Sequence, residues 1–375
     1  MTVIRFLTAG ESHGKALVAI VEGMVAGLAL DEEYINNQLS RRQGGYGRSS
    51  RMKLEQDKAD IVSGVYDGQT LGSPISLMIP NKDWRKEWQE VTRPRPGHAD
   101  LAGIAKYGLA DIRPILERAS ARETAARVAV GAICRRFLEE FDVAIHSHTV
   151  AIGGHRVDGA IVPDWARVEA SPLRCSDPDA EGRMVRAIDE AGAAGDTLGG
   201  VFEVVATGLP AGLGSHVHWD RRLGSQIAQA AMSIQAVKGV EIGAGFAAAE
   251  LRGSRAQDAI GPRLWDRKSN FAGGIEGGVT NGQPVVVRGA VKPVPTVARP
   301  LPSVDIVSGE AVVGHHERSD VCVVPSAGVI AEAMLAIVVA AAVLEKFGGD
   351  HLKETQRNHS AYMRSLPGMT VHPPC

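Results

Sequence analysis

The sequence predicts an α+β fold, with a layer of helices covered by half-buried strands. Three apolar stretches, at 121–141, 220–238 and 326–346, have helical periodicity or are apolar on every side. The strand-like segments around them do not alternate with helices as parallel crossover units do. With 375 residues and 44% hydrophobic content, the chain is long enough for one large domain or two ordinary ones.

The individual elements follow from local patterns along the chain. A turn at 10–14 is expected between the first two strands, and Asp31 is placed to cap a helix that runs to about Arg42. The segment 297–316 is irregular or part strand, and Pro325 falls in the first turn of the last apolar helix, where proline is tolerated. Strands are predicted over 3–9, 17–21, 60–63, 75–79, 143–152, 201–207 and 285–292.

The two segments near the C-terminus differ in character. The stretch 329–344 could be mistaken for a membrane span, but it is shorter than the roughly 20 residues required and contains Glu332. Because it is apolar on every side, it is typical of a helix buried between two layers, and we expect no membrane contact. From Gly348 onward the chain is polar, and we expect 351–375 to be a mobile tail.

Charge and composition argue against a nucleic-acid partner. Lys and Arg total 41 against 43 for Asp and Glu, and aromatic residues make up 5% of the chain. A general nucleic-acid binder has a basic excess, and one that stacks bases has more aromatic side chains. We therefore expect the arginines of this chain to act locally.

The cysteines argue against a disulfide framework and against a zinc site. Cys134, Cys175, Cys322 and Cys375 are far apart, with no Cys-x-x-Cys pair. The N-terminal segment lacks the basic and apolar runs of a secretory signal. These features favour a cytoplasmic protein.

The segment 117–130 is the start of a predicted helix that carries unusual charges. Ser120 and Glu123 have the spacing of a capping box. Arg118 and Arg122 flank the end where the helix dipole is positive, which is unfavourable unless an anion lies among them. Two guanidinium groups at a helix N-terminus suit a phosphate or a carboxylate. The alternative is a pair of solvated arginines on a surface helix.

Two histidines and one Arg–Asp pair are further candidates. His13 and His98 lie in short loops next to glycine, and a histidine can donate a proton near neutral pH to a leaving phosphate or an anionic cofactor ring. A structural hydrogen bond is the alternative for each. In Arg318-Ser319-Asp320, the guanidinium could hold an anion while the carboxylate acts as a base, or the two could form a surface ion pair.

Other motifs give weaker signals. The segment 243–248 matches the dinucleotide pattern G-x-G-x-x-A, but Gly253 interrupts the helix that should follow, so tight turns are favoured. Three histidine pairs are spaced like metal ligands, yet no paired carboxylate accompanies them, and we expect no functional metal. These pairs are His146 with His148, His216 with His218, and His315 with His316.

Taken together, the motifs resemble those of the chorismate synthase family, in family order. The resemblance extends over residues 1 to about 350, and it implies a single catalytic domain over 1–350. It also implies a helical layer sandwiched between antiparallel β-sheets. The motifs lie at 10–23, 41–51, 95–100, 118–124, 233–239, 273–278 and 318–322.

The resemblance implies a reaction, a cofactor and an assembly. The reaction is the last step of the shikimate pathway, an anti-1,4-elimination that converts 5-enolpyruvylshikimate-3-phosphate to chorismate and phosphate. It requires reduced FMN without net redox change. Family members are homotetramers, and NADPH or an external flavin reductase can supply the reduced flavin.

The resemblance also implies roles for individual residues. His13 would protonate the departing phosphate, His98 would tune or protonate the reduced flavin near N1, and Asp320 would assist proton removal near N5. Substrate ligands would be Ser12, Arg48, Arg51, Arg95, Ser120, Ala121, Arg122 and Arg318. FMN ligands would be Arg118, Ala119, Ser120, Gln235, Ala236, Gly277, Lys292, Pro293, Val294, Pro295, Thr296 and Arg318, with Arg42 and Arg48 at positions that match NADP(H) ligands.

The chain departs from the family pattern at one point. It has Lys292-Pro293-Val294-Pro295-Thr296 where the family has a single proline. The second proline removes a backbone donor, so FMN contacts from Lys292 and Thr296 are favoured over those from Val294 and Pro295.

Two other functions are compatible with the arginine-rich loops. A non-catalytic binder of phosphorylated ligands or RNA would use the same arginines, although it would not need the two loop histidines. A flavin reductase that uses NADPH would depend on Arg42 and Arg48 alone.

Overall fold

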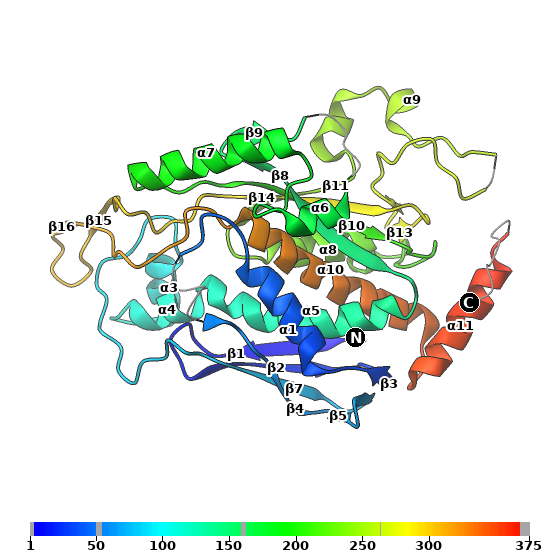
Figure 1. Ribbon diagram of the computed structural model, residues 1–375, viewed down its shortest axis with the longest axis horizontal. Helices are drawn as coiled ribbons and strands as arrows, with labels where there is room; N and C mark the ends of the chain where they lie inside the picture. The colour runs from blue at the N-terminus through cyan, green and yellow to red at the C-terminus, as the bar shows by residue number, and fades with distance from the viewer. Residues whose placement is uncertain (1–3, 50–54, 159–162, 263, 368–375) are drawn as a thin grey trace.

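In the computed structural model, two antiparallel sheets enclose a layer of helices (Figure 1). The structure describes residues 4–49, 55–158, 163–262 and 264–367. The predicted α+β class, with helices sandwiched between antiparallel sheets, is confirmed.

The first sheet covers one side of the helices. Its inward side chains, such as Leu77 and Ile79, are buried, whereas Met78 between them points outward, as expected for an antiparallel sheet with one face on the core. A small sheet of β3 (Ala26–Ala29), β6 (Gln69–Leu71) and β5 (Val65–Tyr66) lies beside it. The strand order is β1 (Arg5–Ala9), β2 (Ala16–Glu22), β7 (Ile75–Pro80), β4 (Asp60–Ser63).

The second sheet covers the opposite side. Phe202 and Val204 of its central strand are buried against the helices. Two hairpins extend from this half of the chain, β12 (Ile275–Glu276) with β13 (Val279–Thr280) and β15 (Pro302–Val304) with β16 (Ala311–Val313). The strand order is β11 (Val237–Ile242), β14 (Val285–Val291), β10 (Gly200–Thr207), β8 (Ala144–Ile152), β9 (His155–Arg156).

The helical layer is built around two helices that approach each other closely. Gly131 of one helix faces Ala333 of the other, and a Cβ atom on Gly131 would lie 2.3 Å from the Ala333 Cβ. The absence of a side chain at Gly131 therefore allows this backbone approach. The layer contains α1 (Glu32–Gln43), α5 (Thr124–Glu139), α8 (Leu223–Met232) and α10 (Val324–Phe347).

Helix α10 is long and apolar enough to cross a membrane by length and composition. In this fold, 89% of its most apolar window is buried inside the protein. The prediction of a buried core helix is confirmed.

The remaining helices lie around the sandwich. Helix α7 runs along the outside of the second sheet (Figure 1). The outer helices are α3 (Asp100–Tyr107), α4 (Arg113–Arg118), α6 (Trp165–Ala170), α7 (Pro178–Ala194), α9 (Gly253–Ala256) and α11 (Leu352–Ser365). Turns of 3₁₀ helix lie at Ala121–Glu123, Trp219–Arg221 and Gly245–Glu250.

Two sequence predictions of secondary structure are corrected. The helix predicted over 220–238 spans only Leu223–Met232, and Ala236, which has a left-handed backbone (φ 69°), precedes strand β11 directly. Helix α7 was not predicted, although Asp177 caps it with hydrogen bonds from the backbone of residues 179 and 180. Pro178 in its first turn and Gly195 after its end are further helix signals.

The segment expected to be a mobile tail forms helix α11 as far as Ser365. His351 and Glu354 form a capping box at its start. Leu352 is buried, and the Tyr362 hydroxyl donates to the Ala211 carbonyl at 2.9 Å. The helix is therefore attached to the body of the protein, and residues 368–375 lie outside the described residues.

A buried charge cluster joins the helical layer to the second sheet. Glu332 of α10 accepts hydrogen bonds from Arg41 (2.6 Å), Arg135 (2.7 Å) and Arg174 (3.1 Å), and from the Ser147 hydroxyl (2.6 Å). Burial alone would raise the pKa of Glu332, but the three guanidinium charges lower it from 4.5 to about 2.

We expect Glu332→Gln to destabilise the fold by about 3–5 kcal/mol at neutral pH, because three guanidinium groups lose a buried anion. The depressed pKa means that the wild-type advantage is complete above pH 4.5 and is lost as pH falls toward 2. Urea unfolding of both proteins at several pH values measures this difference.

The matched control is Glu169→Gln. Glu169 contacts two of the same arginines, Arg41 and Arg174, but its side chain is 40% exposed. We expect a loss below about 1 kcal/mol for this variant, because exposed ion pairs contribute little. Equal losses for the two variants would contradict the importance of burial.

Candidate active site

The turn between β1 and β2 places Ser12 and His13 next to helix α4. Gly10 has φ 104°, and a Cβ atom there would lie 2.3 Å from the Ala16 carbonyl oxygen, so this turn requires glycine. Glu117 fixes the turn, because its carbonyl accepts from the Ser12 amide (3.1 Å) and its carboxylate accepts from the His13 amide (2.8 Å).

A cavity of about 380 Å³ lies where several loops meet the starts of α5 and α10. Its volume is in the range of small-molecule sites. It brings together most of the residues predicted from the sequence, although they are far apart along the chain. These are Ser12, Arg42, Arg48, Arg95, His98, Ala119, Ser120, Ala121, Arg122, Gln235, Ala236, Lys292, Val294, Pro295, Thr296, Arg318 and Asp320.

Five predicted residues stand apart from this set. Among the described residues, His13, Arg118, Gly277 and Pro293 do not line this cavity, and His13 lines a neighbouring one. Arg51 lies outside the described residues.

The predicted capping box at Ser120 is only half correct. The Ser120 hydroxyl caps the first turn as predicted, but it accepts from the Arg122 amide at 3.3 Å and not from the Glu123 amide of a capping box. The Glu123 carboxylate instead accepts from the Thr8 hydroxyl (2.7 Å) and from Arg127 (2.9 Å). It therefore links the helix start to strand β1.

The two arginines of this helix start point in different directions. Arg118 is exposed and donates to the carbonyls of Thr8 (3.0 Å) and Gly10 (3.2 Å). Arg122 is buried, donates to Asn81 at 2.9 Å and pairs with Asp57. The solvated-arginine alternative is therefore wrong for Arg122.

Three arginines, Arg42, Arg48 and Arg122, form one wall of the cavity, called here the arginine wall. Arg42 is buried and donates to the Thr124 hydroxyl (2.9 Å) and the Ala121 carbonyl (3.0 Å) at the start of α5. Burial, together with the charges of Arg122 and Arg48, lowers the pKa of Arg42 to about 10, and the charge of Asp57 opposes this shift. Asp57 pairs with both Arg42 and Arg122, and Asp320 pairs with Arg48, so the wall combines guanidinium donors that suit an anionic ligand with carboxylates that hold them in place.

Asp320 lies beside this wall. One of its carboxylate oxygens accepts from the Ser49 amide at 2.6 Å, and the other lies 3.3 Å from an Arg48 guanidinium nitrogen. The sequence left open whether Arg318 and Asp320 form a surface ion pair. In the structure Arg318 instead contacts Asp83 at 3.5 Å.

His98 is held by a buried carboxylate. Its Nδ1 lies 2.5 Å from Asp100 and 2.9 Å from Arg95, and the shorter contact assigns the Nδ1 proton to the Asp100 bond. Burial alone would raise the pKa of Asp100, but hydrogen bonds from His98 and Arg95 hold it well below its usual range. The ionised Asp100 fixes the imidazole so that Nε2 is the ring nitrogen left for a ligand.

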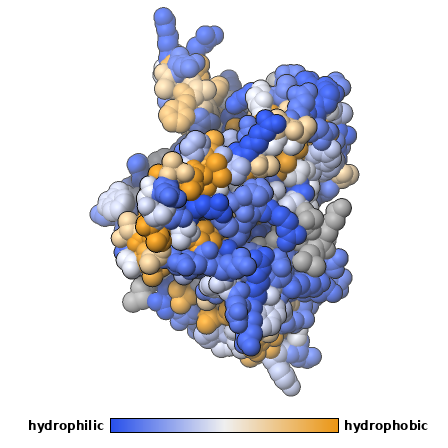
Figure 2. Space-filling view, turned by 90° about the vertical axis from the view of Figure 1, so that its left-hand side faces the viewer, coloured by the Kyte–Doolittle hydropathy of each residue, from blue (hydrophilic) through white to orange (hydrophobic). Residues whose placement is uncertain are grey.

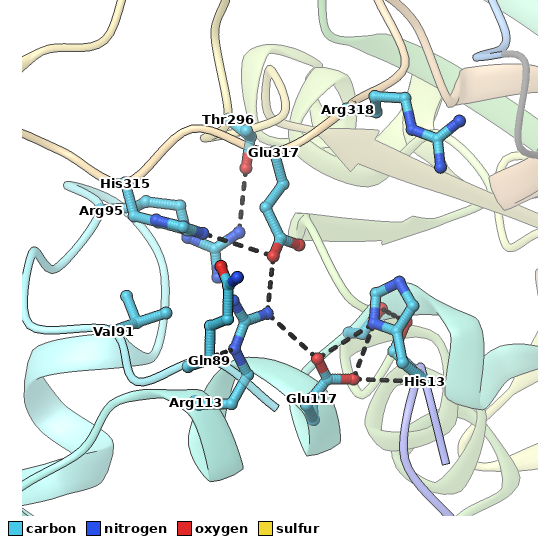
Figure 3. Close-up of polar contacts among 12 residues, drawn as sticks. His13, Gln89, Val91, Arg95, Arg113, Glu117, Thr296, His315, Glu317 and Arg318 are labelled. Atoms are coloured by element: carbon cyan, nitrogen blue, oxygen red, sulfur yellow. Dashed lines mark hydrogen bonds and ion pairs between the residues drawn. The ribbon is translucent and has the colours of Figure 1, made fainter. Parts of the chain in front are cut away.

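His13 is held in the same way at the neighbouring cavity. Its Nδ1 lies 3.0 Å from both Glu117 oxygens, and Arg113 donates to Glu117 at 3.2 Å (Figure 3). Burial alone would raise the pKa of Glu117, but hydrogen bonds with His13 and the His13 charge lower it. Each candidate histidine thus has a buried carboxylate that an arginine also contacts.

The floor of the main cavity is apolar and was not predicted as part of a site. It is formed by Leu116, Ile234 and Val323, and by Ala327 and Ile330 of α10. In a sequence, such residues cannot be told from core residues. Asp100 and Glu117 were also missed as partners of the histidines, although the spacing of His98 and Asp100 could have indicated one of them.

The fold and site define an α+β protein with an arginine-rich cavity in the size range of small-molecule sites. The chorismate synthase family model matches residues 4–344. The chain belongs to the chorismate synthase family.

Individual relatives agree with this family. The chain is 53% identical to a chorismate synthase of Thermobifida fusca (strain YX), over 97% of this chain and 99% of the relative. It is 55% identical to that of Moorella thermoacetica, with the same coverage. A solved structure described as a crystal structure of chorismate synthase aligns with a TM-score of 0.80 at 47% identity, covering 96% of this chain and 97% of the other. The protein is accordingly a carbon–oxygen lyase that acts on a phosphate-bearing substrate.

Proposed function

We propose that the main cavity binds reduced FMN and 5-enolpyruvylshikimate-3-phosphate together, and that its residues, with His13 of the neighbouring cavity, carry out the elimination of phosphate to give chorismate. The observation that carries this proposal is the composition of the cavity. Six cationic side chains line it together with His98, Glu317 and Asp320, and of these three we take His98 and Asp320 as the acid–base groups. The cationic residues are Arg42, Arg48, Arg95, Arg122, Lys292 and Arg318.

The cavity residues fit a flavin. The apolar floor at Val323, Ala327 and Ile330 suits a planar ring system. Gln235 Oε1 is buried without a hydrogen-bond partner among the described residues, as expected for a group that accepts from a ligand. When bound, reduced FMN supplies the electron density that helps phosphate leave a substrate whose departing proton is not acidic.

The arginines fit the charges of the two ligands. The substrate carries two carboxylates and a phosphate, and FMN carries a further phosphate with a charge of about −1.5 to −2. We assign Arg48, Arg95, Arg122 and Arg318 to substrate anions, with Ser12, Ser120 and Ala121 beside them. We assign FMN to Ala119, Ser120, Gln235, Ala236, Lys292, Val294, Pro295, Thr296 and Arg318.

The elimination needs one group that removes a proton from carbon and one that protonates the departing phosphate. The C–O bond to phosphate breaks with its electron pair on phosphate, and a proton leaves the carbon at the other end of the allylic system. The C–H electron pair becomes part of the new diene. In this proposal Asp320 assists removal of that proton, His98 holds a proton near the flavin, and His13 protonates the departing phosphate.

The test is an anaerobic assay of the full chain with reduced FMN and the phosphorylated substrate. We expect release of phosphate together with formation of chorismate, and no release with oxidised FMN. No phosphate release with reduced FMN, combined with retention of RNA at moderate salt, would favour the non-catalytic alternative.

The source of reduced flavin and the cellular setting are further parts of the proposal. Arg42 and Arg48 are the candidate NADPH ligands, and measurement of FMN reduction by NADPH alone separates self-reduction from an external flavin reductase. A cytoplasmic location is supported by Cys134, Cys175 and Cys322, which are free thiols.

A homotetramer is supported by exposed apolar side chains on the outer face of the first sheet. Leu7 is 76% exposed, Val62 61%, Ile20 45% and Met78 38%. Patches of this kind mark protein contacts. Light scattering of the purified protein measures the assembly.

A further inference from the structure

We infer that Asn81 is a positioning residue, which fixes the turn at 10–14 against Arg122 of the arginine wall. Asn81 directly follows strand β7 and lines neither the main cavity nor the second, neighbouring cavity. It therefore acts through the residues it holds and not by contact with a ligand. The inference rests on the proposed function, which assigns His13 to the departing phosphate and Arg122 to the substrate anions.

The burial of Asn81 is unusual for its residue type. The face of the molecule that carries α3, α4 and the β15–β16 hairpin is mainly hydrophilic (Figure 2), as expected when polar side chains stay in water. Asn81 is instead only 3% exposed. A buried amide group is costly unless its hydrogen-bonding atoms have partners, so the partners of Asn81 indicate its role.

The amide nitrogen of Asn81 holds the turn between β1 and β2. Its Nδ2 donates to the Gly14 carbonyl at 2.8 Å and to the Glu11 carbonyl at 3.1 Å. These two residues flank Ser12 and His13 in the chain. Both donors of one side-chain amide are thus used to fix the ends of this segment.

Helix α4 holds the same turn at other atoms. The Glu117 carbonyl accepts from the Ser12 amide, and the Glu117 carboxylate accepts from the His13 amide. Ser12 lines the main cavity and His13 the second one. The direction of these two side chains therefore depends on Asn81 as well as on Glu117.

The amide oxygen of Asn81 binds the arginine wall. It accepts from Arg122 Nε at 2.9 Å. The same guanidinium pairs with Asp57, and its Nη2 lies 3.7 Å from Glu55, which is beyond hydrogen-bonding distance. Arg122 Nη2 has no hydrogen-bond partner among the described residues, as expected for a buried donor that binds a ligand. Asn81 thus orients Arg122 through Nε and leaves Nη2 for an anion.

An asparagine at the end of a strand suits this role. Its side chain carries two N–H donors and an acceptor on one planar group, and the two carbonyls and the guanidinium determine which end is nitrogen. The Asn81 backbone amide donates to the Lys15 carbonyl at 3.0 Å, which continues the pairing of β7 with β2. A side chain on such a rigid element holds its partners more precisely than one on a loop.

The test compares wild type with Asn81→Asp and Asn81→Leu, both of which are close to asparagine in size. Asn81→Asp loses the two donors but keeps an oxygen for Arg122. We expect its turnover to fall by about tenfold or more and its substrate affinity to change by less than about twofold. Asn81→Leu loses all of these contacts, so we expect a similar fall in turnover together with substrate affinity weaker by about fivefold.

Two measurements on the full chain separate positioning from loss of the fold. Turnover is measured anaerobically with reduced FMN and is expressed per flavin-binding site. Affinity for 5-enolpyruvylshikimate-3-phosphate is measured by calorimetry with oxidised FMN, where no turnover is expected. Partial unfolding would lower the number of binding sites without changing either quantity. Wild-type turnover per site in either variant, or wild-type affinity in Asn81→Leu, would overturn the inference.

Asn270→Asp is the matched control. Asn270 Nδ2 donates to the Pro284 carbonyl at 2.8 Å, and its Oδ1 accepts from the Gly274 amide at 2.8 Å. Asn270 is half-buried and lines neither cavity. We expect turnover within about twofold of wild type, because the same donor is removed from a different turn. A loss equal to that of Asn81→Asp would contradict the inference, whereas an inactive wild-type protein would contradict the proposed function.

Discussion

We expect His13→Ala to lower turnover by about 10²- to 10⁴-fold while the affinity for reduced FMN stays unchanged. The imidazole lines the second cavity rather than the main one, and its side chain is only 5% exposed. Its removal therefore deletes a proton donor at the phosphate without changing the flavin surface. Anaerobic turnover measured beside a flavin-binding titration separates the two effects.

Glu117→Gln provides the control for the His13 prediction. The carboxylate at 3.0 Å from Nδ1 fixes the orientation of the imidazole, so this variant alone should also slow turnover. In the His13→Ala background it should add little further loss, because the two residues act as a unit. Additive losses, or a loss of FMN affinity in His13→Ala, would contradict the assigned role.

Asp320→Asn should reduce turnover by a similar factor and change substrate affinity much less. The amide oxygen of asparagine can still accept from the Ser49 amide, which donates to Asp320 at 2.6 Å. The substitution therefore preserves the local shape and removes the base. Steady-state kinetics give turnover and KM separately.

Glu317→Gln is the matched control for Asp320→Asn. Glu317 lines the same cavity, but its charge is compensated by Arg113 and His315. We expect a loss of turnover smaller than about tenfold. If the two variants lost equal activity, or if Asp320→Asn changed only KM, the base assignment would be wrong.

The sequence was sufficient for the architecture because the core helices carry strong apolar signals. Helices α5 and α10 could be placed from the pattern of their side chains, and Asp31 and Pro325 located two helix starts. Helix propensity misled at 233–238, where the left-handed backbone of Ala236 and pairing with β14 determine the conformation. Tertiary contacts of this kind do not produce a periodic pattern of apolar residues in the sequence.

The site was predictable as a set of residues but not as a geometry. Loops that lie far apart in the sequence supply the cavity, and their motifs identified most of its polar lining. The structure shows that His98 lines the main cavity and His13 the neighbouring one. This difference depends on the orientation of the turn between β1 and β2, which directs Ser12 to the main cavity and His13 to the other. The apolar floor depends on where α10 begins, and this is a property of packing.

The close approach of Gly131 and Ala333 has a consequence for the size of the active site. Helices α5 and α10 both begin at the main cavity, and Gly131 and Ala333 meet about two turns from these starts. The spacing of the two helices therefore helps to set the width of the cavity between them. A side chain at Gly131 would force α5 and α10 apart, and because Thr124 of α5 and Ala327 of α10 both line the cavity, we expect such a substitution to change the cavity from outside its lining.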